Sequence, residues 1–126
     1  MLTQVSTEQA PKAIGPYSQA IILDGLIFTS GQIPLVPETG AVVSDDLTLQ
    51  TKQVLNNLKS VLEAAGSNME HVIKTTVFIK DMNDFPIINE IYATYFSQPY
   101  PARSTVEVAR LPKDVFIEIE AIAKLV

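Results

Sequence analysis

The chain has 126 residues, which suits a single domain spanning residues 1–126, and its apolar content of 47% is enough for a buried core. It contains no cysteine and a single histidine, His71, which excludes a disulfide framework, a thiolate nucleophile and a histidine metal cluster. The net charge is −5, and the nine lysine and arginine residues are scattered along the chain. These features disfavour a nucleic-acid partner and predict no bound metal.

The N-terminal residues lack the basic region followed by an apolar region that marks a signal peptide. No apolar run approaches the about 20 residues that a helix needs to span a bilayer. We therefore expect a soluble, cytoplasmic protein without a membrane partner.

Residues 18–43 are expected to begin with a hairpin. Two short apolar runs within residues 18–31 are joined by Asp24-Gly25, a strong signal for a tight turn between antiparallel strands. Prolines and a glycine then mark residues 32–43 as a long loop.

An amphipathic helix is predicted from Leu47 to Ala65, because apolar residues recur there at the helical period. Ser44 or Asp45 can cap its N-terminus, and Gly66 ends it. We expect one face of this helix to be buried.

Residues 71–81 alternate as a strand. One face would carry Ile73, Thr75, Val77 and Ile79, and the other Lys74, Thr76, Phe78 and Lys80. A second helix follows, capped by Asn83 or Asp84, with Pro86 in its first turn, where proline is tolerated. Its apolar stripe comprises Phe85, Ile88, Tyr92, Tyr95 and Phe96.

Two further strands, within residues 100–112 and 116–123, complete the chain. The pattern therefore predicts an α+β domain with both helices on one face of a sheet. The other face is too apolar for water and too polar for a core. It would carry Thr76, Phe78, Glu118, Glu120 and Ile122. A mixed face of this kind usually contacts another subunit, so we expect a homo-oligomer with polar pockets between its subunits.

The last two strands contain the residues that most resemble a reaction site. Arg103 begins the first of them, and arginine can hold a small carboxylate through two parallel hydrogen bonds. Glu118 and Glu120 share one face of the second strand. These residues could clamp an acid and move a proton. The alternative is that all three are solvated or ion-paired surface charges.

A direct hairpin between these two strands would keep Arg103 and Glu118 apart. Arg103 would lie opposite about residue 123, which is roughly 16 Å from Glu118 at ~3.3 Å per residue. Either the two strands are not direct neighbours, or the two side chains meet across a subunit boundary. The mixed sheet face favours the second alternative.

Five sequence blocks together resemble the RidA/YjgF/YER057c/UK114 family. They are "AIGPYSQA", "FTSGQIP", "VIKTTVFIKDMNDF", "PARSTVEVARLPKD" and "IEIEAIA", and they extend from about residue 10 to residue 124. The resemblance implies a chorismate-mutase-like fold, in which a six-stranded mixed sheet is backed by two helices. It also implies a homotrimer with three ligand clefts between its subunits.

The activity that the resemblance implies is hydrolysis of reactive 2-imino acids, such as 2-iminobutanoate and 2-iminopropanoate, to 2-oxo acids and ammonia without a cofactor. Arg103 would bind the substrate carboxylate, and Glu118 would position or activate the attacking water. A carboxylate partly removed from water gains proton affinity, which suits the role of Glu118. The same cleft would be lined by Tyr17, Ser30, Gly31 and Asn89.

The expected roles of the lining residues differ. Tyr17 would donate its hydroxyl to the ligand or simply form a wall of the pocket. Ser30 is suited to hydrogen bonding, and Gly31 permits close approach of the backbone to a ligand. Thr105 stands where many family members have a cysteine, and its hydroxyl and N–H can still bind a ligand. Glu107 and Glu120 are expected to be structural.

Two alternatives to an imine deaminase stay open at this point. The same cleft could bind a 2-oxo acid or another small acid as a regulatory module without turnover. An endoribonuclease or translation inhibitor is a description attached to the family, but the acidic composition and single histidine disfavour it.

Overall fold

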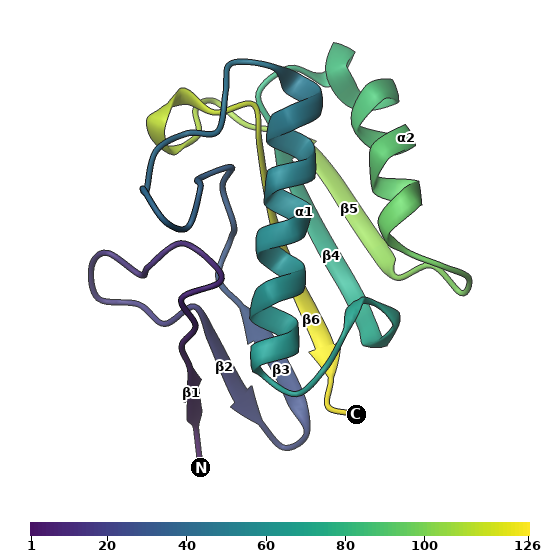
Figure 1. Ribbon diagram of the computed structural model, residues 1–126. Helices are drawn as coiled ribbons and strands as arrows, with labels where there is room; N and C mark the ends of the chain where they lie inside the picture. The colour runs from purple at the N-terminus through teal and green to yellow at the C-terminus, as the bar shows by residue number, and fades with distance from the viewer.

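The computed structural model describes residues 1–126, which form one six-stranded sheet with two helices on one of its faces (Figure 1). This confirms the predicted α+β architecture and mixed sheet. The helices are α1 (Leu47–Ala64) and α2 (Phe85–Tyr95). The strands are β1 (Thr3–Val5), β2 (Ala20–Leu23), β3 (Leu26–Thr29), β4 (Val72–Ile79), β5 (Ala102–Glu107) and β6 (Ile117–Lys124).

The strands lie in the order β1-β2-β3-β6-β4-β5, and every neighbouring pair is antiparallel except β4 and β5. The predicted hairpin joins β2 and β3, and its turn residues Asp24 and Gly25 both have positive φ, at 51° and 79°. The last strand does not pair with its predecessor in the chain, because β4 lies between β5 and β6. β1, at one edge of the sheet, has no counterpart in the sequence-based element order.

The cap of α1 differs from the predicted one. Asp46 is the last residue with an extended backbone, and its carboxylate accepts a hydrogen bond from the Leu49 N–H at 2.8 Å. Ser44 instead accepts from the Asp46 N–H at 3.1 Å. The prediction of Ser44 or Asp45 as the N-cap is therefore wrong by one or two residues, because three candidate capping side chains follow one another here. The other helix, α2, begins after Asp84, one of the two predicted cap residues, but the Asp84 side chain makes no capping hydrogen bond.

A bulge interrupts the alternation of β4. Val72 lies opposite Ala123, whereas Lys74 lies opposite Ile122, so one extra residue is inserted in β4 between these pairs. The side chain of Ile73 is consequently 48% exposed, and Val72 takes the buried position. The prediction that Ile73 shares the buried face of Thr75 is wrong for this reason.

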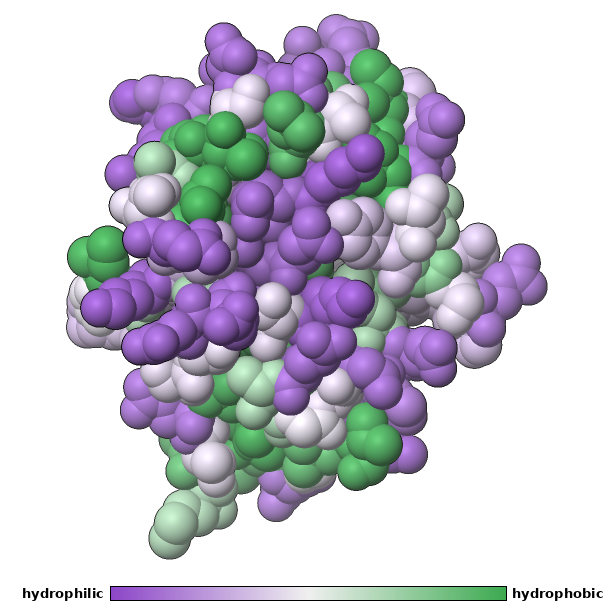
Figure 2. Space-filling view, in the orientation of Figure 1, coloured by the Kyte–Doolittle hydropathy of each residue, from purple (hydrophilic) through white to green (hydrophobic).

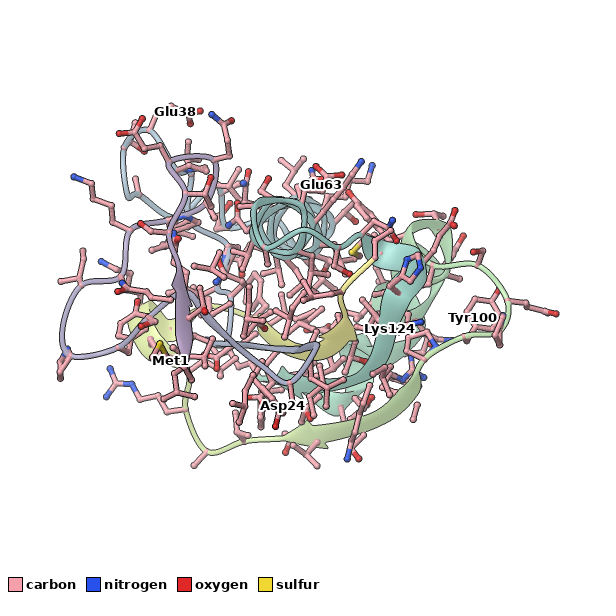
Figure 3. The ribbon with its side chains drawn as sticks, turned by 90° about the horizontal axis from the view of Figure 1, so that it is seen from below. Met1, Asp24, Glu38, Glu63, Tyr100 and Lys124 are labelled. Carbon is pink, nitrogen blue, oxygen red and sulfur yellow. The ribbon has the colours of Figure 1, made fainter.

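The hydrophobic core fills the layer between the sheet and the helices. α1 contributes Val54, Leu55, Leu58, Val61 and Leu62, and β6 contributes Ile117, Ile119, Ala121 and Ala123. Figure 3 shows α1 end-on, on one side of the sheet, with the labelled Glu63 at its near end. The outward side of the helix layer is largely hydrophilic (Figure 2), and neither helix is long and apolar enough to cross a membrane.

The opposite face of the sheet is not covered by any helix (Figure 1). The strand register places Phe78 beside Glu118, Thr76 beside Glu120, and Lys74 beside Ile122 on this open face. The mixed composition predicted for it is therefore confirmed. The open face also carries exposed apolar side chains, including Phe28 and Val106.

Candidate functional site

Arg103 lines a pocket of about 470 Å³ between α2, β5 and the loop that precedes β5. One of its five N–H donors is bonded within the protein, from Nη1 to the Asn89 side-chain oxygen at 2.8 Å. No carboxylate pairs with it, since the chain's single ion pair joins Arg110 to Asp114. The guanidinium is therefore free to accept an acidic ligand. The pocket is lined by Asn89, Tyr92, Ala93, Tyr100, Pro101 and Arg103.

Arg103 and Glu118 lie on opposite faces of the sheet. Arg103 lies opposite Thr75 of β4, and Glu118 lies opposite Phe78 of the same strand. Because Thr75 and Phe78 are three residues apart, their side chains point in opposite directions and are offset by about 10 Å along the strand. Arg103 therefore lies on the helix side, and Glu118 on the open side. The sequence left open whether the strands of Arg103 and Glu118 are direct neighbours. They are not, because β4 lies between β5 and β6.

Glu118 lies against Gly31. The Gln32 N–H donates to the Ile119 carbonyl at 2.8 Å, and the Ile119 N–H donates back to the Gln32 carbonyl at 3.1 Å. This bridge brings the backbone at Gly31 beside the Glu118 side chain. A Cβ atom at Gly31 would overlap the Glu118 carboxylate, so only glycine permits this approach.

Burial raises the pKa of Glu118 above its ordinary value, and the negative charge of Glu120 on the same face raises it further. Neither a cation nor a hydrogen-bond donor of the subunit compensates the Glu118 carboxylate. A carboxyl group in such surroundings has an increased tendency to hold a proton at a pH where an exposed glutamate has lost it. This property suits a group that takes up a proton and gives it back.

The remaining predicted residues are divided between these two regions and a third. Ser30 precedes Gly31, and its hydroxyl donates to the Ser18 carbonyl at 2.6 Å. Asn89 lies with Arg103 in the pocket. Tyr17 is 50% exposed on the loop before β2, where it lines a different pocket from Arg103, and its neighbour Ser18 is the residue that bonds to Ser30. The subunit thus brings Arg103 together with Asn89, and Glu118 together with Gly31.

Thr105 lies two residues beyond Arg103 on the same face of β5. Its hydroxyl oxygen is buried and is the chain's one buried side-chain polar atom without a hydrogen-bond partner. An unsatisfied buried hydroxyl destabilises a fold by about 1–3 kcal/mol. Its predicted role in ligand binding stays a prediction. Glu107, expected to be structural, accepts a hydrogen bond from the Met82 N–H at 2.8 Å.

Several residues of the arginine pocket were not among the sequence-based candidates. The sequence pattern assigns Tyr92 only to the apolar stripe of α2, and it predicts no role for Tyr100 and Pro101. Tyr100 lies at the outer edge of the molecule (Figure 3). The sequence offers one signal for them, since Tyr100 and Pro101 directly precede the strand that contains Arg103. No group of three or more His, Cys, Asp or Glu side chains is placed to hold a metal ion.

Comparisons with known proteins agree with this architecture. The family model described as Endoribonuclease L-PSP matches residues 7–125. A RutC family protein of Pyrococcus horikoshii is 60% identical over 119 residues, which are 94% of each chain. The 2-iminobutanoate/2-iminopropanoate deaminase of Salmonella typhimurium is 53% identical over 126 residues, or 98% of each chain. The crystal structure of E. coli TdcF with bound serine has a TM-score of 0.92 and 47% identity, covering 98% of this chain and 99% of that one.

The raised pKa of Glu118 predicts a specific dependence of stability on pH. The folded state holds a proton on Glu118 that the unfolded chain has released, so this contribution is complete below about pH 4.5 and is lost as the pH rises through the folded-state pKa. Glu118→Gln cannot ionise. Its melting temperature should therefore rise relative to that of the unmodified protein as the pH increases from 4 to 8.

The matched control is Glu63→Gln, which removes one negative charge from the exposed side of α1. Thermal melts of the three proteins across this pH range decide the matter. A difference between Glu118→Gln and the unmodified protein that stays constant with pH would show that Glu118 ionises freely.

Proposed function

The chain belongs to the Endoribonuclease L-PSP family, and from that premise we propose that it hydrolyses small 2-imino acids to 2-oxo acids and ammonia. The observation that carries the proposal is the Arg103 guanidinium, which lines a pocket without a carboxylate partner. The names of two similar proteins support the choice of substrate. A relative of similar length is a 2-iminobutanoate/2-iminopropanoate deaminase, and a similar structure binds serine, a small molecule with a carboxylate.

The proposed mechanism uses one anchor and one proton carrier. Arg103 holds the substrate carboxylate through two N–H donors, which fixes the C=N carbon for attack by water. Glu118 accepts a proton as the water oxygen bonds to the carbon of the protonated imine, whose nitrogen becomes a neutral amine. The protonated Glu118 then donates this proton to the amine nitrogen. As the C–N bond breaks and ammonia leaves, the carbon-bound hydroxyl becomes the carbonyl and gives its proton to the departing ammonia. The sum is one protonated imino acid and one water converted into one 2-oxo acid and one ammonium ion, with Glu118 returned to its ionised state.

The placement of the two residues constrains where this reaction occurs. A ligand that contacts Arg103 on the helix side and Glu118 on the open side cannot lie within one subunit. We therefore place the active site between two copies of the chain, in a homotrimer assembled through the open face. Tyr17 and Ser30 would join the cleft from the subunit that contributes Glu118, and Asn89 from the subunit that contributes Arg103.

The experiment generates an imine in situ with threonine dehydratase and measures its hydrolysis in competition with an amine trap such as semicarbazide. The protein should increase the share of imine that becomes 2-oxobutanoate. Arg103→Ala should lower kcat/KM by about 10²-fold or more, because it removes two charge-assisted hydrogen bonds, each of about 1.5–3 kcal/mol.

Arg110→Ala is the matched control for this experiment, because Arg110 is an exposed arginine whose ion pair with Asp114 lies outside the pocket. It should leave kcat/KM within about twofold of the unmodified value. The proposal fails if the protein does not accelerate imine hydrolysis, or if Arg103→Ala and Arg110→Ala behave alike. Tight binding of 2-oxobutanoate without hydrolysis would favour a ligand-binding module instead.

A second test addresses the contact between Gly31 and Glu118. Gly31→Ala should fold, because the group that the new methyl meets is the end of a flexible side chain that can rotate away. The rotation displaces the carboxylate, so kcat should fall by about tenfold or more.

The double variant Gly31→Ala with Glu118→Gln separates this effect from obstruction of the ligand. If the methyl acts by moving the carboxylate, it should lower kcat no further once Glu118 is already replaced. An equal loss in both backgrounds would instead show that the methyl obstructs the ligand, and would contradict the role given to this contact.

A further inference from the structure

Arg103 rests against the aromatic side of α2. Its guanidinium carbon lies 4.8 Å from the centre of the Tyr92 ring and 5.2 Å from the centre of the Phe85 ring. A cation within about 6 Å of a ring centre is attracted by the negative face of the ring. Asn89 accepts a hydrogen bond from Nη1 on the same side. Three side chains of one helix therefore contact a single guanidinium on β5.

These three residues occupy one face of α2. Phe85, Asn89 and Tyr92 are spaced at intervals of four and three residues, which aligns them along the helix. α2 packs on α1, and its residues Ile88 and Tyr92 belong to the hydrophobic core, so this face of the helix is held in place beside β5. Arg103 thus meets a rigid surface, whereas an arginine on an exposed edge strand would otherwise be free to move.

Tyr92 is held from its other side as well. Its hydroxyl forms a hydrogen bond of 2.7 Å with the Thr75 hydroxyl, and its ring lies 4.5 Å from the Phe96 ring. Tyr92 is 4% exposed, and burial raises the pKa of its hydroxyl, so the ring stays neutral. Thr75 is also the residue of β4 directly opposite Arg103. The contacts therefore run from β4 to α2 and back to β5, and they hold the Tyr92 ring in place beside the guanidinium.

We propose that Tyr92 is a positioning residue, which holds the Arg103 guanidinium so that its unused N–H donors face the pocket. This inference rests on the proposed function, in which Arg103 binds the carboxylate of a 2-imino acid. Holding the side chain before the ligand arrives removes part of the entropy loss of binding. Tyr92 would then affect the affinity for the carboxylate, and leave the proton transfers at Glu118 untouched.

The role predicts which kinetic constant changes. Tyr92→Leu removes the ring and should raise KM for 2-iminobutanoate, and Kd for 2-oxobutanoate, by about tenfold, with kcat within about twofold. Tyr92→Phe retains the ring and removes only the hydroxyl. It should lower the melting temperature, because the buried Thr75 hydroxyl loses its partner, and leave Kd within about threefold.

Tyr95→Leu is the matched control, because Tyr95 is the neighbouring tyrosine of α2 and does not line the arginine pocket. A purely structural role for Tyr92 predicts that Tyr92→Leu and Tyr95→Leu both lose thermal stability and leave Kd unchanged. Kd is measured by calorimetry at least 20 °C below each melting temperature, so that loss of folded protein does not imitate weak binding.

Phe85→Leu is a second variant at a half-buried position, and it decides the question if Tyr92→Leu does not fold. It should raise Kd for 2-oxobutanoate by about threefold, since it removes one of the two rings. Unchanged Kd in the variants that fold, with binding intact in the unmodified protein, would overturn the inference alone. Failure of the unmodified protein to bind 2-oxobutanoate and to hydrolyse the imine would overturn the proposed function and this inference together.

Discussion

The position of β4 between β5 and β6 is the constraint on which the functional account depends. It separates Arg103 from Glu118 by two strand spacings, and the three-residue offset between Thr75 and Phe78 directs the two side chains to opposite faces. No rotamer change within the subunit can bring these side chains to one small ligand. In the proposed mechanism each face therefore contributes one of the two residues, and a ligand that contacts both would lie between two copies.

The surroundings of the two residues are built on different physical principles. On the helix side, an arginine without a carboxylate partner contacts aromatic rings and one amide, and its other N–H donors have no partner in the chain. On the open side, Glu118 is half-buried beside Gly31 without a compensating cation, which raises its pKa. The first arrangement suits the negatively charged ligand that we propose, and the second suits the proposed proton transfers. Glu118 lies on the open face and Arg103 on the helix side. A role for Glu118 in a site between copies would account for the mixed composition of the open face, which is too polar for a core and too apolar for solvent.

The sequence predicted most of the fold because its periodic signals were strong. Both helices, the β2–β3 hairpin and the mixed open face followed from hydrophobic spacing and from the turn at Asp24-Gly25. The strand order could not be predicted from hydrophobic spacing, since pairing between distant segments leaves no local pattern in the sequence. The bulge at Ile73 was hidden for a related reason, because an inserted residue interrupts the alternation on which the prediction relied. β1 is only three residues long, too short for a periodic signal.

Among the site residues, chemistry singled out Arg103 and Glu118, but the sequence could not place them on opposite faces without the strand order. Tyr92 illustrates a different limit. Its spacing fitted a core position, and the structure shows that the ring is indeed buried while also contacting the arginine. When a residue both packs in the core and contacts a functional residue, a single sequence shows only its hydrophobic spacing.

The central claim, that a complete site takes Arg103 from one copy and Glu118 from another, is tested most directly by mixing two inactive variants. Arg103→Ala and Glu118→Gln subunits carrying different tags are unfolded, combined in equal amounts and refolded, and mixed oligomers are confirmed by co-purification. Random assembly leaves about one quarter of shared sites with both residues intact, so about a quarter of the unmodified imine hydrolase activity should return. Activity no higher than that of the separately refolded variants would contradict the claim.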